Sequence, residues 1–307
     1  MLKLKATITA HRGAVTSLLI DQRRRLLYSG SSDGTVAMLN LNTLDYQKRL
    51  FGFTEKGINC LSLFADNSAD QSPKIFVGTD DGLYLVNAET NKLERSYKPE
   101  NQEGDTQTMD CKQSGALLYA CQTDGAESQY ELYSGELKFQ LRGHTGVVLA
   151  LDQIKLDGGS DLICSGGEDG KLFFYNNKGV ALHTVETKSS VSCIRFSPHG
   201  GVLAVLSLGC LRVFQITDKV RLNRKTVLLK RELQLPRENQ FLHAFCFCQR
   251  HIFLAGMGRV CLIDIFKGAI IQQFEFPGEE FISCASDGKT CACGARGGRT
   301  FVFELVQ

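Results

Sequence analysis

Two stretches of the chain repeat almost the same phrase. Residues 29–40 read SGSSDGTVAMLN, and residues 165–176 read SGGEDGKLFFYN. Each stretch has small residues, an Asp-Gly turn, an apolar run, and then a bulky apolar residue followed by asparagine. An Asp-Gly pair between two apolar runs is typical of a tight turn that joins two strands. Because the phrase recurs, we expect a fold built from repeated units.

Weaker copies of the phrase occur along the rest of the chain. Each ends in a bulky apolar residue followed by a polar one, and successive copies are 39 to 49 residues apart. That spacing is typical of a unit of four strands. The seven pairs are Leu39-Asn40, Val86-Asn87, Tyr130-Glu131, Tyr175-Asn176, Phe214-Gln215, Ile263-Asp264 and Phe303-Glu304.

The segments between these pairs alternate apolar and polar residues with a period of two. Examples are residues 15–20, 147–151 and 191–196 before the repeated phrase, and residues 46–50 and 137–141 after it. Alternation with a period of two indicates strands that bury one face. Since no stretch has a convincing 3.6-residue apolar period, the sequence predicts an all-β protein.

The repeated copies resemble the WD-repeat family of β-propellers over nearly all of the 307 residues. The resemblance rests on Gly143-His144 before a strand, on the Asp-Gly turns, and on the bulky-polar pairs, which stand where the family most often has Trp-Asp. This chain has no tryptophan. The resemblance implies one domain, residues 1–307, folded as a seven-bladed propeller of four-stranded antiparallel blades. The four turns are Asp33-Gly34, Asp81-Gly82, Asp124-Gly125 and Asp169-Gly170.

The family's motif also implies a structural role for two sets of polar residues. In that motif a histidine, a serine or threonine, the turn aspartate and the tryptophan form a hydrogen-bonded tetrad. Because a buried carboxylate or imidazole persists only when it is paired, these residues are expected to hold the fold rather than to catalyse a reaction. The matching residues are His11, Ser29 and Asp33 in the first copy, and His144, Ser165, Asp169 and Tyr175 in the fourth.

The first residues of the chain have no strand of their own copy to pair with. Residues 2–8 alternate as LKLKATI, and the last copy ends at its third strand. We therefore expect the N-terminal strand to complete the last blade and close the ring, which would remove an exposed sheet edge. The family's topology places the turns and the strand-entry loops on one face. There we expect a partner-binding surface made of Arg12, Asp81, Glu168, Arg259, Arg296 and Arg299.

A solvated mixture of charges is the alternative interpretation of that face. A second candidate surface is the basic segment 217–237, which contains Arg221, Arg224, Lys225, Lys230 and Arg231. Basic residues on an outer strand discourage unwanted strand pairing, and this explains the segment without a ligand. Contact with RNA, phosphate or an acidic partner is the alternative.

Composition limits the function classes. With 35 basic and 33 acidic residues, the net charge of +2 gives no overall attraction for nucleic acid or a membrane. The first 13 residues lack the apolar core of a signal peptide, so we expect the protein in the cytoplasm, the nucleus or both. The twelve cysteines lie mostly in apolar runs, where free cysteine packs as a small hydrophobe.

Motifs for chemistry are missing from the sequence. It has no phosphate-binding loop and no H-E-x-x-H or C-x-x-C pattern. Two Cys-x-Cys pairs, at 246–248 and 291–293, do not by their spacing supply a four-ligand zinc site. We therefore expect no cofactor, no metal and no enzymatic activity.

The resulting hypothesis is a non-catalytic scaffold for protein–protein interactions. We expect a monomeric propeller that is a subunit of a larger multiprotein complex, with other proteins as partners. Two alternatives stay open. One is an RNA- or phosphate-contacting module that uses residues 217–237. The other is a substrate adaptor of a cullin-type ubiquitin ligase, suggested by the near match of residues 175–178, YNNK, to that docking motif.

Overall fold

The computed structural model contains only β-strands as regular elements in the ranges that it describes. Those ranges are residues 1–51, 54–65, 72–97, 107–156, 161–208, 210–218, 222, 225–234 and 242–306, with the side chains of residues 242 and 243 outside the description. Each four-strand copy begins with a strand rich in small and β-branched residues, and tight turns join it to the next. The prediction of an all-β protein is therefore confirmed. Among the described residues no helix is present that could cross a membrane.

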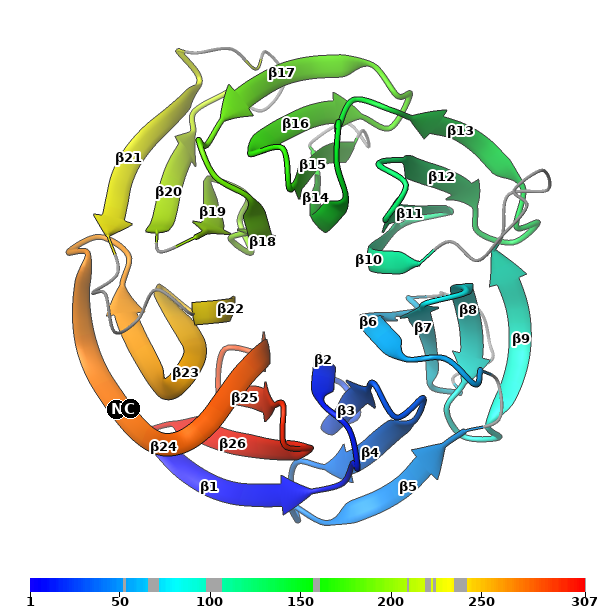
Figure 1. Cartoon of the computed structure of the whole chain (residues 1–307), viewed down its shortest axis with the longest axis vertical. Helices are drawn as coiled ribbons and strands as arrows, with labels where there is room; N and C mark the ends of the chain where they lie inside the picture. Colours follow the sequence, from blue (N-terminus) through cyan, green and yellow to red (C-terminus); the bar gives the residue numbers. More distant parts are fainter. Residues whose placement is uncertain are drawn as a thin grey trace. The chain divides into compact units, whose positions relative to one another are not determined.

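Five sheets have four strands each and follow one another along the chain (Figure 1). The first two contain β2 (Val15–Asp21), β3 (Leu26–Ser31), β4 (Val36–Asn40) and β5 (Tyr46–Leu50), then β6 (Ile58–Leu63), β7 (Lys74–Thr79), β8 (Gly82–Asn87) and β9 (Lys92–Tyr97). The third contains β10 (Thr108–Ser114), β11 (Leu117–Gln122), β12 (Glu127–Glu131) and β13 (Leu137–Leu141). The fourth contains β14 (Val148–Lys155), β15 (Asp161–Gly167), β16 (Lys171–Asn176) and β17 (Ala181–Glu186). The fifth contains β18 (Val191–Phe196), β19 (Val202–Ser207), β20 (Cys210–Ile216) and β21 (Val227–Gln234).

The prediction of seven four-stranded blades is wrong, because the described residues form six sheets and the sixth has six strands. Copies six and seven share it. The strand order is β1 (Leu2–Thr9), β26 (Arg299–Leu305), β25 (Thr290–Ala295), β24 (Ala269–Ser286), β23 (His251–Asp264) and β22 (Leu242–Cys248).

The merger of the last two copies has a local cause. β23 and β24 have 14 and 18 residues, and each spans a stretch that the repeat pattern divides into two strands. Met257 of β23 pairs with Glu280 of β24, while Arg259 pairs with Glu275. Pairing thus continues past Gly258, where the pattern places a turn within copy six, and past Gly278, where it places the break between copies six and seven; both glycines are at positive φ.

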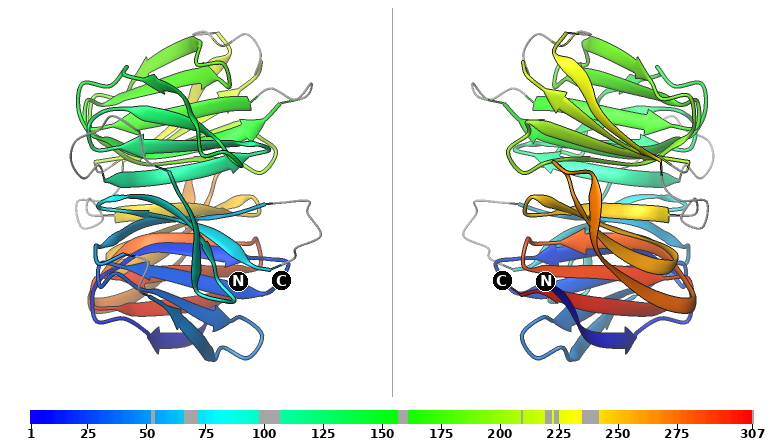
Figure 2. Two further views of the ribbon diagram at one scale, coloured as in Figure 1. Left: turned by 90° about the vertical axis from the view of Figure 1, so that its right-hand side faces the viewer. Right: turned by 90° about the vertical axis from the view of Figure 1, so that its left-hand side faces the viewer.

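The N-terminal strand joins this sixth sheet. β1 pairs antiparallel with β26, from Leu2 opposite Leu305 to Thr9 opposite Arg299. The two chain ends lie side by side (Figure 2), and the Met1 amino group donates a hydrogen bond to the Val306 carbonyl at 2.5 Å. The expected pairing with the last copy is thus present, but as the edge of a six-stranded sheet and not as the fourth strand of a separate seventh blade.

The chain divides into two compact units, residues 1–96 with 241–307 and residues 97–240. Within each unit the sheets stack face to face, with their first strands adjacent, as the blades of a propeller do. Apolar clusters fill the spaces between consecutive sheets of a unit. The single-domain organisation over residues 1–307 stays a prediction.

Glycines in the second strands allow this close stacking. Gly166 of β15 lies against the next sheet of the second unit, where an added Cβ would be 2.6 Å from Val191 Cγ1 and 2.7 Å from Ile194 Cδ1. We expect Gly166→Ala to lower the unfolding free energy by about 1–3 kcal/mol, because the sheets would have to separate. Urea denaturation measures this. Gly201→Ala is the matched control, since an added Cβ there meets no atom within 4 Å; equal losses in both variants would contradict the packing argument.

Candidate functional site

A hydrogen-bonded network of polar side chains connects the loops of the fourth copy. His144 lies 3.0 Å from Ser165 Oγ through Nε2 and 2.9 Å from Asp169 Oδ1 through Nδ1. Asp169 also accepts hydrogen bonds from the backbone N–H groups of Thr145 and Lys171, both at 3.1 Å. Burial acts to raise the pKa of Asp169, but these hydrogen bonds outweigh it and lower the pKa. The carboxylate therefore ties the turn of β15 and β16 to the loop before β14.

The first copy has a related network. His11 Nε2 lies 2.8 Å from Ser29 Oγ, and its Nδ1 lies 3.2 Å from Thr35 Oγ1 and 3.4 Å from Asp33 Oδ2. Asp33 accepts hydrogen bonds from Thr35 Oγ1 at 2.6 Å and from the Arg12 backbone N–H at 2.9 Å. Burial opposes ionisation of Asp33, yet these donors lower its pKa to about 2. The carboxylate is thus held charged inside its turn.

Both networks contain the serine, histidine and aspartate of a hydrolase triad, but access rules out that role. Ser29 and Ser165 have no exposed surface, and the side chains of His11 and His144 are fully buried. A nucleophile must reach a substrate carbonyl group, and these hydroxyl groups face the interior. The arrangement holds loops in place.

The fourth-copy network differs from the sequence expectation at one position. The buried hydroxyl group of Tyr175 has no hydrogen-bond partner among the described residues. Instead, Ser165 Oγ lies 2.5 Å from Oε1 of Glu127 in β12, a residue that the sequence reasoning missed. The signal was weak: β12 reads ESQYE, a polar run where other copies have apolar residues, and all but its last residue are buried.

The connecting loops of the first unit lie side by side along one edge, which we call the first loop edge. It consists of residues 11–13, 32–34, 54–57, 80–81 and 296–299. Glycines show the contacts: Gly298 packs against the His11 carbonyl and Gly13 against Ser32. A Cβ added to Gly34 would lie 3.2 Å from the Lys56 carbonyl oxygen, and one added to Gly57 would lie 3.1 Å from an Asp80 carboxylate oxygen. Loops from three successive sheets thus form one surface.

This edge brings together part of the predicted partner-binding set. Arg12 is exposed and forms no ion pair with a described residue. Arg296 pairs with Glu280 at 2.8 Å but keeps 65% of its side chain exposed, and Arg299 pairs with the buried Glu279.

Two predicted residues of the first unit have other partners. Arg259 lies in β23 and pairs with Glu275 at 3.6 Å. Asp81 accepts a hydrogen bond from Thr79 at 2.5 Å within its own turn. Of the predicted arginines, Arg12 and Arg296 are thus the most available to a partner.

Glu168 belongs to the second unit, in the turn between β15 and β16, where it is exposed. The connecting loops of the second unit also contact one another. A Cβ added to Gly146 would lie 3.3 Å from Glu168 Cβ, and one added to Gly125 would lie 3.2 Å from the Gly146 carbonyl oxygen. Residues 124–125, 144–146, 167–170 and 188–189 form this second loop edge, since Gly170 in turn faces Ser189.

The other two candidate segments, residues 217–237 and 175–178, belong to the second unit. The basic segment supplies β21, whose Lys230 and Arg231 are exposed, and Lys225 lies just before it. Arg221 and Arg224 lie outside the described residues. In residues 175–178, which nearly match the ligase-docking motif, Asn176 Oδ1 accepts a hydrogen bond from the Lys178 backbone N–H at 3.0 Å, and the Lys178 side chain is exposed.

A cluster of buried charges that the sequence reasoning missed lies on the first strands of the second unit. Asp110 of β10 lies 2.9 Å from Lys112 Nζ and 3.3 Å from an Arg195 guanidinium nitrogen. It also accepts the Leu151 backbone N–H at 3.3 Å, so it bridges two sheets. Burial opposes its charge, but Lys112 and Arg195 outweigh that and lower the pKa of Asp110. The available signal was the pair of opposite charges at positions 110 and 112 of one strand, β10, which reads TMDCKQS.

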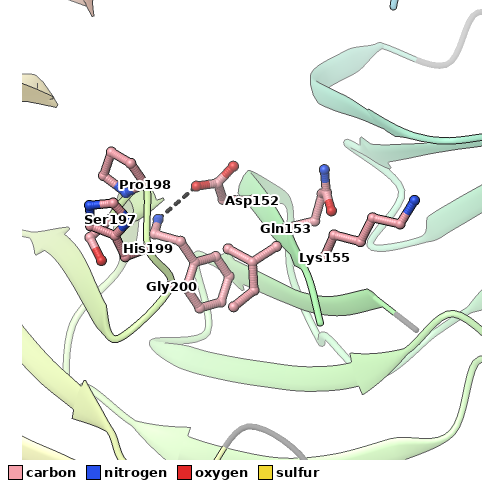
Figure 3. Close-up of a pocket in the computed structure, with 9 residues that line it drawn as sticks. Asp152, Gln153, Lys155, Ser197, Pro198, His199 and Gly200 are labelled. Atoms are coloured by element: carbon pink, nitrogen blue, oxygen red, sulfur yellow. Dashed lines mark hydrogen bonds between the residues drawn. The ribbon is translucent and has the colours of Figure 1, made fainter. Parts of the chain in front are cut away.

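Asp152 of β14 extends this cluster toward a pocket of about 420 Å³ (Figure 3). Its carboxylate accepts the Phe196 backbone N–H at 2.7 Å, and burial raises its pKa despite Arg195 and Lys112. Figure 3 shows Lys155 extending away from Asp152. Because Asp110 and Asp152 each bridge to the next sheet, we assign the cluster to the positioning of the sheets. The pocket is lined by residues 152–155 and 196–200.

Comparison with known proteins agrees with these networks and sheets. The family model "WD domain, G-beta repeat" matches residues 2–38 and 135–176, which contain both networks apart from Glu127. Two segments of the chain are thus similar to WD repeats.

Three curated relatives share part of the chain. Cross-pathway control WD-repeat protein 2 of Flammulina velutipes is 27% identical over 107 residues, 34% of this chain and 33% of that protein. Eukaryotic translation initiation factor 3 subunit I of Kluyveromyces lactis is 31% identical over 93 residues, 30% of this chain and 26% of that protein. Small ribosomal subunit protein RACK1 of Schizosaccharomyces pombe is 31% identical over 98 residues, 32% of this chain and 30% of that protein. The chain thus spans a third or less of the length of these relatives.

Proposed function

We propose that this chain is a non-catalytic scaffold subunit of a larger multiprotein complex in the cytoplasm, and that it binds other proteins through the first loop edge. The observation that carries the proposal is the gathering of loops from three sheets, with Arg12 and Arg296 exposed upon them. Rigid strands position these side chains before a partner arrives, so that binding need not order them. Arginine suits such a surface because its planar group forms bidentate hydrogen bonds.

The names of the relatives support the assembly role. Two of them are named as parts of assemblies, a subunit of a translation initiation factor and a protein of the small ribosomal subunit. We propose by analogy that this chain is also one component among several.

Affinity purification of the tagged chain tests the surface. We expect Arg12→Glu with Arg296→Glu to reduce the recovery of associated proteins at least tenfold, because two reversed charges would cost about 1.4 kcal/mol or more at an interface. Mass spectrometry of the recovered proteins measures this. Lys92→Glu with Lys267→Glu is the control, because it reverses two exposed charges elsewhere in the same unit. Equal recovery with both double variants would contradict the assignment of the surface.

The same purification separates the two alternatives. Partners that are lost after nuclease treatment would support RNA contact through Lys225, Lys230 and Arg231. Recovery of a cullin adaptor that Lys178→Ala abolishes would support a ligase role. The pairing of β21 as an ordinary outer strand of its sheet supports the scaffold over the RNA module.

A further inference from the structure

Glu127 connects two sheets of the second unit through the fourth-copy network. It lies on β12 of the third sheet, is 4% exposed, and its Oε1 lies 2.5 Å from Ser165 Oγ on β15 of the fourth sheet. The same oxygen lies 3.5 Å from His144 Nε2. Four side chains therefore form one line: Glu127, Ser165, His144 and Asp169.

The number of protons in this line is set by its geometry. Asp169 accepts a hydrogen bond from His144 Nδ1–H, so Nε2 must either accept a hydrogen bond from Ser165 or carry a second proton. In the first case Ser165 donates a hydrogen bond to Nε2 and accepts one from the protonated, uncharged Glu127. In the second, Ser165 donates to an ionised Glu127 and accepts from a charged His144. The two arrangements have equal net charge and differ in the position of one shared proton.

Burial decides between them. It raises the pKa of Glu127 to about 7, and the neighbouring Asp169 acts in the same direction while the Ser165 hydrogen bond opposes it. Burial also lowers the pKa of His144. Both directions favour the uncharged pair. The other titratable groups that act on these two are Tyr175, Cys164 and Lys171.

We infer that Glu127, Ser165, His144 and Asp169 share a proton and form a pH-sensitive clasp for the second loop edge. The clasp is complete while Glu127 is protonated. When Glu127 loses its proton, a negative charge is left in a buried site beside Asp169, and the ties from Asp169 to the 144–146 and 167–170 loops weaken. The first copy has no such clasp, because Ser29 forms no hydrogen bond to a carboxylate of a described residue.

Unfolding measured across pH tests the clasp. A carboxyl group whose pKa rises from 4.5 to about 7 on folding stabilises the fold below pH 4.5, and this contribution is lost as the pH rises through 7. Between about pH 4 and pH 8, the unfolding constant of the wild type should therefore rise about 300-fold relative to Glu127→Gln, a difference of about 3.4 kcal/mol. Urea denaturation at each pH measures the ratio. Parallel profiles would overturn the inference.

Two further measurements test the inference without the Glu127→Gln variant. In the wild type labelled at glutamate side-chain carbons, the Glu127 carboxyl signal should titrate close to pH 7, and a titration below pH 5 would overturn the inference. Backbone amides of Thr145 and Lys171 should lose hydrogen-exchange protection between about pH 6 and pH 8 once intrinsic rates are removed. Glu186→Gln, an exposed change in the same unit, should leave the pH profile unchanged. None of these measurements needs a partner, so the clasp and the proposed scaffold role can fail separately.

Discussion

Asp110→Asn is expected to lower the free energy of unfolding by about 3 kcal/mol at neutral pH. The Asp110 side chain is 10% exposed and forms ion pairs with the Lys112 ammonium group and the Arg195 guanidinium group, whose side chains are 20% and 30% exposed. Removing the negative charge leaves two cations in a mostly desolvated site. Asparagine keeps the acceptor for the Leu151 backbone N–H, so the loss reports the charge and not the bridge. Urea denaturation followed by circular dichroism measures it.

A second substitution separates charge from packing. Lys112→Met in the Asp110→Asn background removes one stranded cation and keeps the side-chain volume, so it should recover about half of the loss. Asp45→Asn is the exposed control and should change stability by less than about 0.5 kcal/mol. A loss below about 1 kcal/mol for Asp110→Asn would show that the cluster does not hold the sheets.

Deletion of residues 1–9 is expected to lower the unfolding temperature by about 10 °C or more. The deletion removes β1 and exposes the edge of β26. Leu2 is 3% exposed within the core of the sixth sheet, and its backbone N–H and carbonyl both bond to the Gln272 side chain, at 2.7 and 2.8 Å. The lost apolar burial of Leu2 and Leu4 alone corresponds to about 4 kcal/mol. Differential scanning calorimetry measures the change.

Complementation provides the control for this deletion. A synthetic peptide of residues 1–10 should bind the truncated protein and restore most of the unfolding temperature, whereas a scrambled peptide should not. Lys5→Ala removes only an exposed ion pair with Glu304 and should have little effect. An unchanged unfolding temperature after deletion would show that β1 is dispensable.

Much of the local structure could be predicted from the sequence. The turns at Asp33-Gly34 and Asp169-Gly170 could be predicted, because a tight turn depends on only a few neighbouring residues. The pairing of residues 2–8 with the last copy could be predicted as well, because these residues alternate as a strand does and the last copy lacks its fourth strand. The number of sheets could not be predicted. Whether Met257 pairs with Glu280 depends on how two long hairpins meet, and the repeat spacing does not record that contact.

The candidate sites divide in the same way. The resemblance to the WD-repeat family indicated His144, Ser165 and Asp169, because they match positions of the family's motif. Glu127 came from another sheet, and its carboxyl group meets Ser165 across 38 residues of sequence. Asp110 and Arg195 are 85 residues apart, yet they form one ion pair.

The sequence by itself determined the strands, the tight turns and the membership of two segments in the WD-repeat family, because alternation and Asp-Gly turns are local properties. Only the tertiary structure decided that the last two copies share one sheet, that Glu127 and not Tyr175 joins the fourth-copy network, and that four ionisable side chains of the second unit, Asp110, Lys112, Asp152 and Arg195, cluster together. The physical reason is that burial and hydrogen bonding depend on which side chains of neighbouring sheets meet, and a linear pattern does not specify those meetings.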